Sequence, residues 1–171
     1  MGIGRNFQEA LQKACQSLEI RRNGLGADGK EMTDVAAIKH SLSHPSWNRL
    51  FHIYDAFKVG LSFKTIQNLT KIDPWFLHQV EELVELEKQI QQYDLEDLPP
   101  SLALTAKQKG YADRQIAHLL GVKESRMYKY RQDHRIKRVF KCVDTCAAEF
   151  AAKTPYYYST FSVSQDEPEN E

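Results

Sequence analysis

The feature that most constrains the fold is one long amphipathic segment with a clear start. Asp73 offers an N-cap, and Pro74 takes the first helical position, where the missing N–H of proline costs nothing. The apolar residues that follow recur at spacings of three and four, as on one face of an α-helix. The segment therefore predicts a long helix with one buried face and an acidic solvent face. Its apolar residues are Phe76, Leu77, Val80, Leu83, Val84 and Ile90, and its acidic residues are Glu81, Glu82, Glu85 and Glu87.

Shorter helices are predicted elsewhere in the chain. Residues 7–18 follow the helical period, Thr33 and Ser62 are predicted N-caps, and Gly60 suits the position just beyond a helix end. A stripe of large residues at helical spacing predicts a further helix that buries aromatic side chains in the core. The Trp75-Phe76 pair is likewise expected in the core, with contact to a partner protein as the less favoured alternative for both sets. The stripe consists of Trp47, Leu50, Phe51, Tyr54 and Phe57.

Breaks between these helices suggest how the chain is divided. Three glycines fall within residues 23–29, which predicts a flexible loop, and Asp94 to Pro100 ends any helix with a Pro-Pro pair. Residues 139–143 are β-prone and begin an irregular return segment. The fold class is therefore all-α, with two small multihelical subdomains. The predicted divisions are residues 1–22, a helix and linker; 23–98, the first subdomain; 99–161, the second; and 162–171, a disordered tail.

Composition and charge exclude several functional classes. The chain has 23 Lys and Arg against 23 Asp and Glu, so no overall field would gather nucleic acid or an anionic membrane. Its three cysteines are an odd number without the spacing of a disulfide framework, which predicts a reducing compartment, the cytoplasm. No apolar run reaches the roughly 20 residues of a membrane span, and no secretory signal is recognised.

One segment has the pattern of a helix-turn-helix. Residues 113–131 place apolar positions on both sides of Gly121, and Asp113 is the predicted cap of the first short helix. Residues 107–141 hold eleven Lys or Arg against three acids, which is typical of a surface that follows phosphates. A helical pair whose basic face meets protein is the equal alternative. A nucleic-acid regulator would use Lys123, Arg126, Lys129 and Arg131.

No catalytic, cofactor-binding or metal site is predicted. His40 and His44 are four residues apart, as are Cys142 and Cys146, but nothing in the sequence brings the two pairs together. Buried free thiols are the expected state of the cysteines. The remaining Asp, Glu and His residues are scattered, and no nucleophile, base and orienting group are grouped together.

Several long motifs resemble one known family. Residues 61–77 with 81–87, residues 141–150, and residues 154–160 resemble the large chain of carbamoyl-phosphate synthase, specifically its oligomerisation, or connection, domain. Residues 3–14 resemble the helix that closes the first of the two ATP-grasp halves of that chain. The family motif within residues 141–150 comprises Asp144, Thr145, Cys146, Ala147, Ala148, Glu149 and Phe150.

The resemblance implies a scaffold without catalytic residues. The parent enzyme makes carbamoyl phosphate from bicarbonate, ammonia released from glutamine, and two ATP, for arginine and pyrimidine biosynthesis. ATP, Mg or Mn, and K would bind outside this chain. The implied partners are the flanking ATP-grasp domains, other large chains and the small glutamine amidotransferase subunit. This resemblance makes nucleic acid the less favoured partner, and a membrane is not expected.

The start of the long helix is the predicted association surface. Trp75, Phe76 and Leu77 are three adjacent large apolar residues, and one helix cannot direct all three into the same core. A surface that pairs with its own copy would do so through an isologous contact. We therefore expect these residues to contribute to association between chains.

Overall fold

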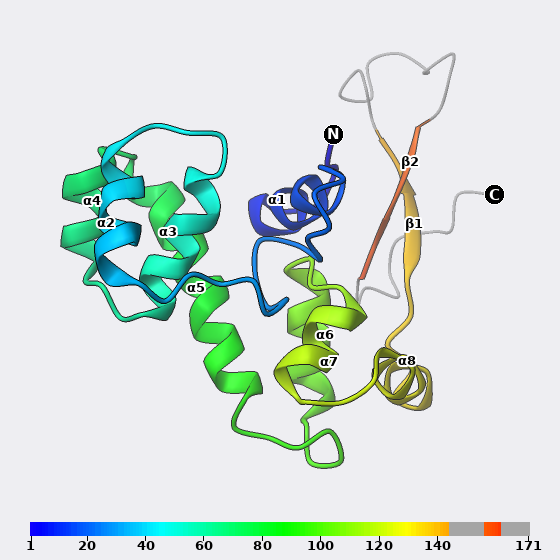
Figure 1. Cartoon of the computed structure of the whole chain (residues 1–171). Helices are drawn as coiled ribbons and strands as arrows, with labels where there is room; N and C mark the ends of the chain where they lie inside the picture. Colours follow the sequence, from blue (N-terminus) through cyan, green and yellow to red (C-terminus); the bar gives the residue numbers. More distant parts are fainter. Residues whose placement is uncertain (144–155, 162–171) are drawn as a thin grey trace.

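The computed structural model describes residues 1–143 and 156–161. Within these ranges the chain is mostly helical, which confirms the predicted fold class (Figure 1). No helix of the described residues is long and apolar enough to cross a membrane. The elements are α1 (Phe7–Gln16), α2 (Val35–Ser43), α3 (Arg49–Lys58), α4 (Phe63–Thr70), α5 (Pro74–Ile90), α6 (Pro100–Gln108), α7 (Asp113–Leu119), α8 (Glu124–Asp133), β1 (Val139–Cys142) and β2 (Tyr157–Thr160).

The return segment includes a short β-ribbon in place of irregular structure. β1 pairs antiparallel with β2, with Val139 opposite Thr160 and Cys142 opposite Tyr157. The β-prone residues after α8 therefore find a partner strand in the tyrosine-rich stretch. The family motif at residues 144–150 and the predicted tail at residues 162–171 lie outside the described residues.

The helix starts follow local capping chemistry. Asp73 caps α5, because its Oδ1 accepts a hydrogen bond from the Trp75 backbone N–H at 2.9 Å, and Ser62 caps α4 as predicted. The prediction for α2 was wrong by one residue. Asp34 is the cap in place of Thr33, since the Asp34 carboxylate accepts from two backbone N–H groups of the first turn.

The helix α5 is the central element of the fold. It packs against α1, α3 and α4 on one part of its length and against α6 and α7 on another (Figure 1). α5 thus contacts helices on both sides of the boundary predicted at residues 94–100, and the division into subdomains stays a prediction. Its buried apolar residues are Leu77, Val80, Leu83, Val84, Leu86 and Ile90.

The predicted solvent face of α5 contains one residue that is buried instead. Glu87 is 0% exposed, because it follows Leu83 by four positions and Val84 by three and so shares their inward face. Its carboxylate accepts hydrogen bonds from the Tyr54 hydroxyl at 2.5 Å and the Tyr111 hydroxyl at 2.9 Å, and it pairs with Lys58 at 3.0 Å. These partners make the burial of a charge tolerable.

The glycine-rich loop was wrongly predicted to be flexible. Leu25 and Ala27 are buried, and the loop backbone is hydrogen-bonded to the side chains of Gln12 on α1 and Gln115 on α7. A Cβ added to Gly26 would lie 2.1 Å from the Tyr54 ring, so glycine is required there by close packing. The loop is therefore part of the core.

The aromatic stripe lies in the core, except for its first residue. Phe51, Tyr54 and Phe57 are buried as predicted, whereas Trp47 is 76% exposed. The reason is that α3 begins only at Arg49, so Trp47 precedes the helix and does not follow its period.

Candidate association surface

The first turn of α5 divides its three large residues between core and solvent. Leu77 is 1% exposed, whereas Trp75 is 51% and Phe76 is 46% exposed. A helix turns by about 100° per residue, so consecutive side chains cannot share one direction. The expectation that Trp75 and Phe76 are core residues was therefore wrong, because both rings are about half exposed. They lie at the predicted association surface, and their use in association stays a prediction.

The exposed rings belong to an ordered aromatic cluster. The ring centroid of Phe7 on α1 lies 5.2 Å from Trp75 and 5.4 Å from Phe76, and the latter two lie 5.0 Å apart. All three pairs have the edge-to-face geometry that aromatic side chains favour. The cluster is therefore already held in place by α1, and little side-chain entropy remains to be lost on binding.

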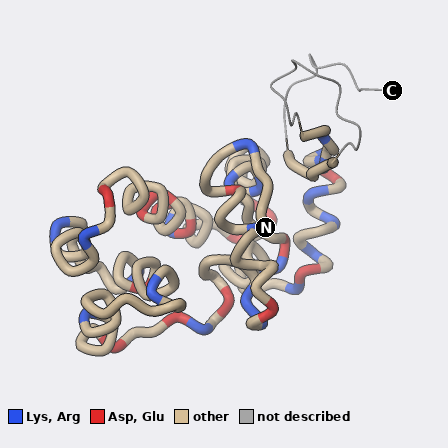
Figure 2. The backbone as a smooth tube through the Cα atoms, turned by 90° about the horizontal axis from the view of Figure 1, so that it is seen from above, with Lys and Arg blue, Asp and Glu red and all other residues tan. Residues whose placement is uncertain are grey.

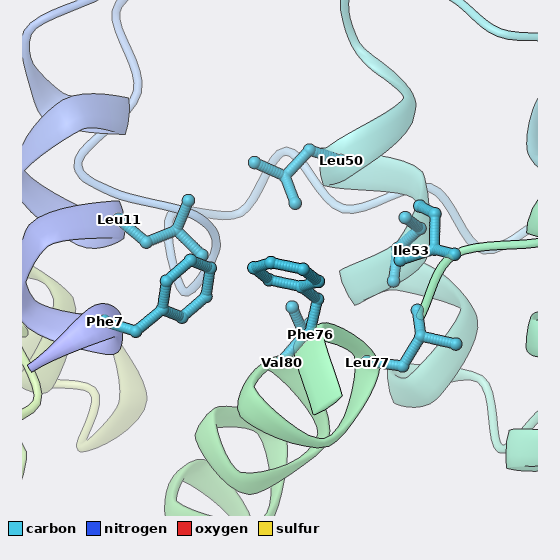
Figure 3. A pocket seen from close by; sticks show the side chains of 8 residues that line it. Phe7, Leu11, Leu50, Ile53, Phe76, Leu77 and Val80 are labelled. Carbon is cyan, nitrogen blue, oxygen red and sulfur yellow. The ribbon is translucent and has the colours of Figure 1, made fainter. Parts of the chain in front are cut away.

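A partly open apolar pocket of about 200 Å³ adjoins this cluster. Figure 3 shows side chains from α1, α3 and α5 directed into it. Ile72, from the segment before α5, also lines the pocket. Periodicity placed several of these residues on helices, but it could not show that three separate helices leave a hollow. The lining residues are Phe7, Leu11, Leu50, Ile53, Ile72, Phe76, Leu77 and Val80.

The lining of the pocket limits what it can bind. All of the lining side chains are hydrocarbon, with no donor, acceptor or charge for a phosphate or a metal ion. Among residues 1–143 and 156–161, no group of three His, Cys, Asp or Glu could hold a metal. The pocket therefore does not fit ATP, and it suits an apolar group.

The histidine and cysteine pairs are not brought together by the described structure. His40 and His44 stack on each other at 4.3 Å on the exposed side of α2. Cys15 is buried, and burial raises the pKa of its thiol to about 11, with a smaller opposing effect of Arg22. Cys142 lies in β1, and Cys146 lies outside the described residues.

The helix-turn-helix uses part of its positive charge internally. Asp113 is not the cap of α7 but its first helical residue, and its carboxylate pairs with Lys107 at 2.8 Å and Arg131 at 3.1 Å. Burial alone would raise the pKa of Asp113, but these two cations bring it below its ordinary value. Arg126 pairs with Glu96 on the surface. Two of the four residues predicted to contact nucleic acid are thus already paired.

Basic residues of this half also contact an aromatic ring. Figure 2 shows that charged residues of both signs lie along the described chain. The buried Arg131 also faces the ring of Phe161, with 5.4 Å between the guanidinium carbon and the ring centroid. Lys107 Nζ on α6 lies 4.9 Å from the centroid of the same ring, so basic residues of this half help to bind the return segment to α6 and α8.

The two ends of the described chain meet at one side chain. Lys13 Nζ donates to the Ile3 carbonyl at 2.9 Å and to the Ser159 carbonyl at 2.5 Å, and it pairs with Glu9 at 2.9 Å. The same ammonium lies 5.6 Å from the centroid of the Tyr158 ring. Lys13 thus fixes the N-terminal segment beside β2 (Figure 1).

Comparison with known proteins gives a consistent result. A family model described as carbamoyl-phosphate synthetase large chain, oligomerisation domain, matches residues 1–135. The chain is 46% identical to the carbamoyl phosphate synthase large chain of Archaeoglobus fulgidus, over 100% of this chain and 16% of that protein. It is 44% identical to the large chain of Synechocystis sp., over 98% of this chain and 16% of that protein.

A third relative is named as a section of the same protein. It is the carbamoyl phosphate synthase large chain, N-terminal section, of Aquifex aeolicus, 43% identical over 94% of this chain and 28% of that protein. The chain thus spans about a sixth of the length of the full large chains that it matches. The chain belongs to the carbamoyl-phosphate synthetase large-chain family, in which it corresponds to the oligomerisation domain.

Proposed function

We propose that the chain is a non-catalytic unit that associates large chains of carbamoyl-phosphate synthase and connects the two ATP-grasp halves of each. The observation that carries this proposal is the half-exposed pair Trp75 and Phe76 beside an all-apolar pocket. A few residues, often large aromatic ones buried in pockets of the partner, supply most of the binding energy at protein interfaces. The partner for this surface is another large chain, which agrees with the family description.

The connector role is supported by the junction at Lys13. A domain that connects two halves must hold its incoming and outgoing segments in a fixed relation, and Lys13 binds residues on both. The neighbouring ATP-grasp domains and the small glutamine amidotransferase subunit are the further proposed partners. In that assembly bicarbonate, glutamine-derived ammonia and two ATP yield carbamoyl phosphate in the cytoplasm. The ATP, Mg or Mn, and K of the reaction are proposed to bind in the ATP-grasp halves, and the apolar lining of the pocket in this chain agrees with that placement.

A helix-turn-helix regulator is the weaker alternative. α7 and α8 do pack on each other across the Gly121 turn. However, Lys107 and Arg131 are buried with Asp113 and are not available to phosphates.

Sedimentation equilibrium over a wide concentration range tests the association. The 171-residue chain should form a reversible dimer or larger assembly, and the Trp75→Ala and Phe76→Ala variants should weaken it by about tenfold or more, as for interface anchors. Trp47→Ala is the matched control, because it removes an equally large exposed ring from a segment outside the pocket. A strict monomer at every concentration would exclude the proposed association.

A parallel sample with a DNA duplex at low salt separates the two functions. We expect the duplex to sediment separately from the protein. Co-sedimentation that is lost as salt rises would favour the regulator, since phosphate binding weakens steeply with salt.

The connector role needs a test in a complete enzyme. This chain would replace the matching segment of the Archaeoglobus fulgidus large chain, to which it is 46% identical. The chimera should still form carbamoyl phosphate, whereas deletion of the segment should abolish it. Undiminished activity after deletion would show that the segment connects nothing essential.

A further inference from the structure

We infer that two copies of this chain associate by exchanging Trp75, so that the indole ring of each copy enters the pocket between α1, α3 and α5 of the other. This inference rests on the proposed association and names its central contact. It goes beyond the family description, which gives neither the surface nor the residues.

The size and chemistry of the pocket suit an indole ring. An enclosed apolar cavity of about 150 Å³ accepts benzene in another protein. A partly open pocket of about 200 Å³ therefore has room for the larger indole system. Because the lining is entirely hydrocarbon, a charged or strongly polar side chain would lose its hydration there without compensation.

Trp75 is placed to enter such a pocket in a second copy. Its ring contacts Phe7 and Phe76, and both of these also line the pocket. The exposed half of Trp75 thus stands at the rim of its own pocket. A two-fold axis that passes beside this rim brings the same ring of the second copy over the opening.

A two-fold contact also explains why ring and hollow lie on one patch. In an isologous interface each copy presents the same surface, so that surface must contain both the inserting group and its receptor. The present patch contains both. A heterologous contact would allow ring and pocket to lie on different faces.

The charges next to the patch are compatible with self-pairing. Lys71 and Asp73 are both exposed and directly precede the first turn of α5. Opposite signs two positions apart allow Lys71 of one copy to face Asp73 of the other across a two-fold axis. Such exposed pairs contribute little affinity. A partner with charge of one sign is disfavoured, because it would meet a like charge at either Lys71 or Asp73.

The fluorescence of Trp75 reports insertion directly. The sequence has two tryptophans, so Trp47→Phe leaves Trp75 as the single emitting indole. Its emission should shift to shorter wavelength as concentration rises, because a half-exposed ring becomes enclosed. The midpoint of this shift should coincide with the midpoint of association from sedimentation equilibrium.

Pocket-filling variants test the receptor side. In the Trp47→Phe background, Leu50→Phe fills the pocket from α3 and Leu11→Phe fills it from α1. Each should weaken association by about tenfold or more and reverse the Trp75 shift. Circular dichroism and thermal unfolding would verify that each variant folds. The same effect from variants on two different helices would exclude a local packing defect as its cause.

A soluble competitor needs no variant. 3-Methylindole is the tryptophan side chain ending in a methyl group, and it should move the unmodified chain towards monomer as it occupies the pocket. Indole-3-acetate has the same ring with a carboxylate and should compete more weakly, because the pocket offers that charge no partner.

The outcomes separate this inference from the function on which it rests. Association with an unchanged Trp75 spectrum, or association that tolerates both pocket variants and 3-methylindole, would overturn the exchange of Trp75 and leave the association intact. A monomer under all conditions would overturn both.

Discussion

The ammonium of Lys13 in α1 donates a hydrogen bond to the backbone carbonyl of Ser159 in β2, across 146 positions of sequence. Since Lys13 also holds the Ile3 carbonyl and pairs with Glu9, one side chain joins the beginning of the chain to its return segment.

Replacing Lys13 by methionine should loosen the return segment while preserving the apolar stem. We expect a loss of about 1–2 kcal/mol in the free energy of unfolding, the lower range for charged hydrogen bonds because the side chain is partly exposed. Amide hydrogen exchange in residues 157–160 should accelerate as well. Urea unfolding provides the measurement, and Lys88→Met, which removes an exposed pair with Glu85, should cost no more than about 0.5 kcal/mol. Equal effects of the two variants would argue against the junction.

Glu87→Gln should lower the stability of the fold strongly, although the sequence pattern places Glu87 on a solvent face. The carboxylate accepts hydrogen bonds from two tyrosine hydroxyls and pairs with Lys58. A glutamine amide has one accepting oxygen, and its NH2 group can only donate, so it cannot replace all three interactions. We expect a loss of about 3–5 kcal/mol, as for other broken buried pairs. Glu85→Gln on the exposed side of α5 is the control and should be nearly neutral in the same urea titration. A small effect at Glu87 would mean that the network contributes little.

The chain should lose stability in alkali through Tyr54 and Tyr111. Burial first, and then the nearby Glu87 carboxylate, raise the pKa of both hydroxyls above the ordinary value of 10. The folded chain therefore keeps protons that the unfolded chain releases above about pH 10, and unfolding becomes easier as pH rises. Each group contributes at most about 1.4 kcal/mol per pH unit.

The measurement for this pH dependence is the slope of unfolding free energy between about pH 9 and 11. Tyr111→Phe should flatten that slope, although it also lowers stability at neutral pH by removing a donor to Leu83 and Glu87. Comparison with the unchanged chain cancels the contributions of other groups, such as Cys15. An unaltered slope would contradict the assignment.

Two glycines should respond very differently to alanine. At Gly26 the new Cβ would lie 2.1 Å from the Tyr54 ring, and we expect a loss of at least about 3 kcal/mol from overpacking. At Gly60 nothing lies within 4 Å, and only its φ of +81° opposes alanine, at about 1–2 kcal/mol. Thermal unfolding of the two variants distinguishes these cases. A loss at Gly26 no greater than at Gly60 would mean that the loop moves aside freely.

Local signals predicted the helices well. The Asp73-Pro74 start and the apolar period of α5 depend only on neighbours within a few residues, and both are confirmed. Glu87 was missed because its charge was given more weight than its position on the buried face. Trp47 was wrongly predicted to be buried, because the spacing of apolar residues does not show where a helix begins.

Features that join distant segments could not be predicted in the same way. The pocket needs α1, α3 and α5 at once, and the pairing of Asp113 with Lys107 and Arg131 depends on how α6, α7 and α8 pack. Sequence reasoning counted those cations as a surface charge, since nothing local shows that they are buried. The expectation that Trp75 and Phe76 are core residues was wrong, although the rule that adjacent positions on a helix point apart did predict that Trp75, Phe76 and Leu77 could not all be buried together.

The buried amide of Gln12 in α1 has a consequence for synthesis of the chain. Gln12 accepts from the Leu25 backbone N–H and from the Gln115 side chain, so this part of the core closes only when α7 is present. At about 5–20 residues per second, the ribosome needs roughly 5–20 s to pass from one glutamine to the other. During that interval α1 and the glycine-rich loop lack their final neighbours, so the buried amide of Gln12 stays without one of its partners until α7 has been synthesised.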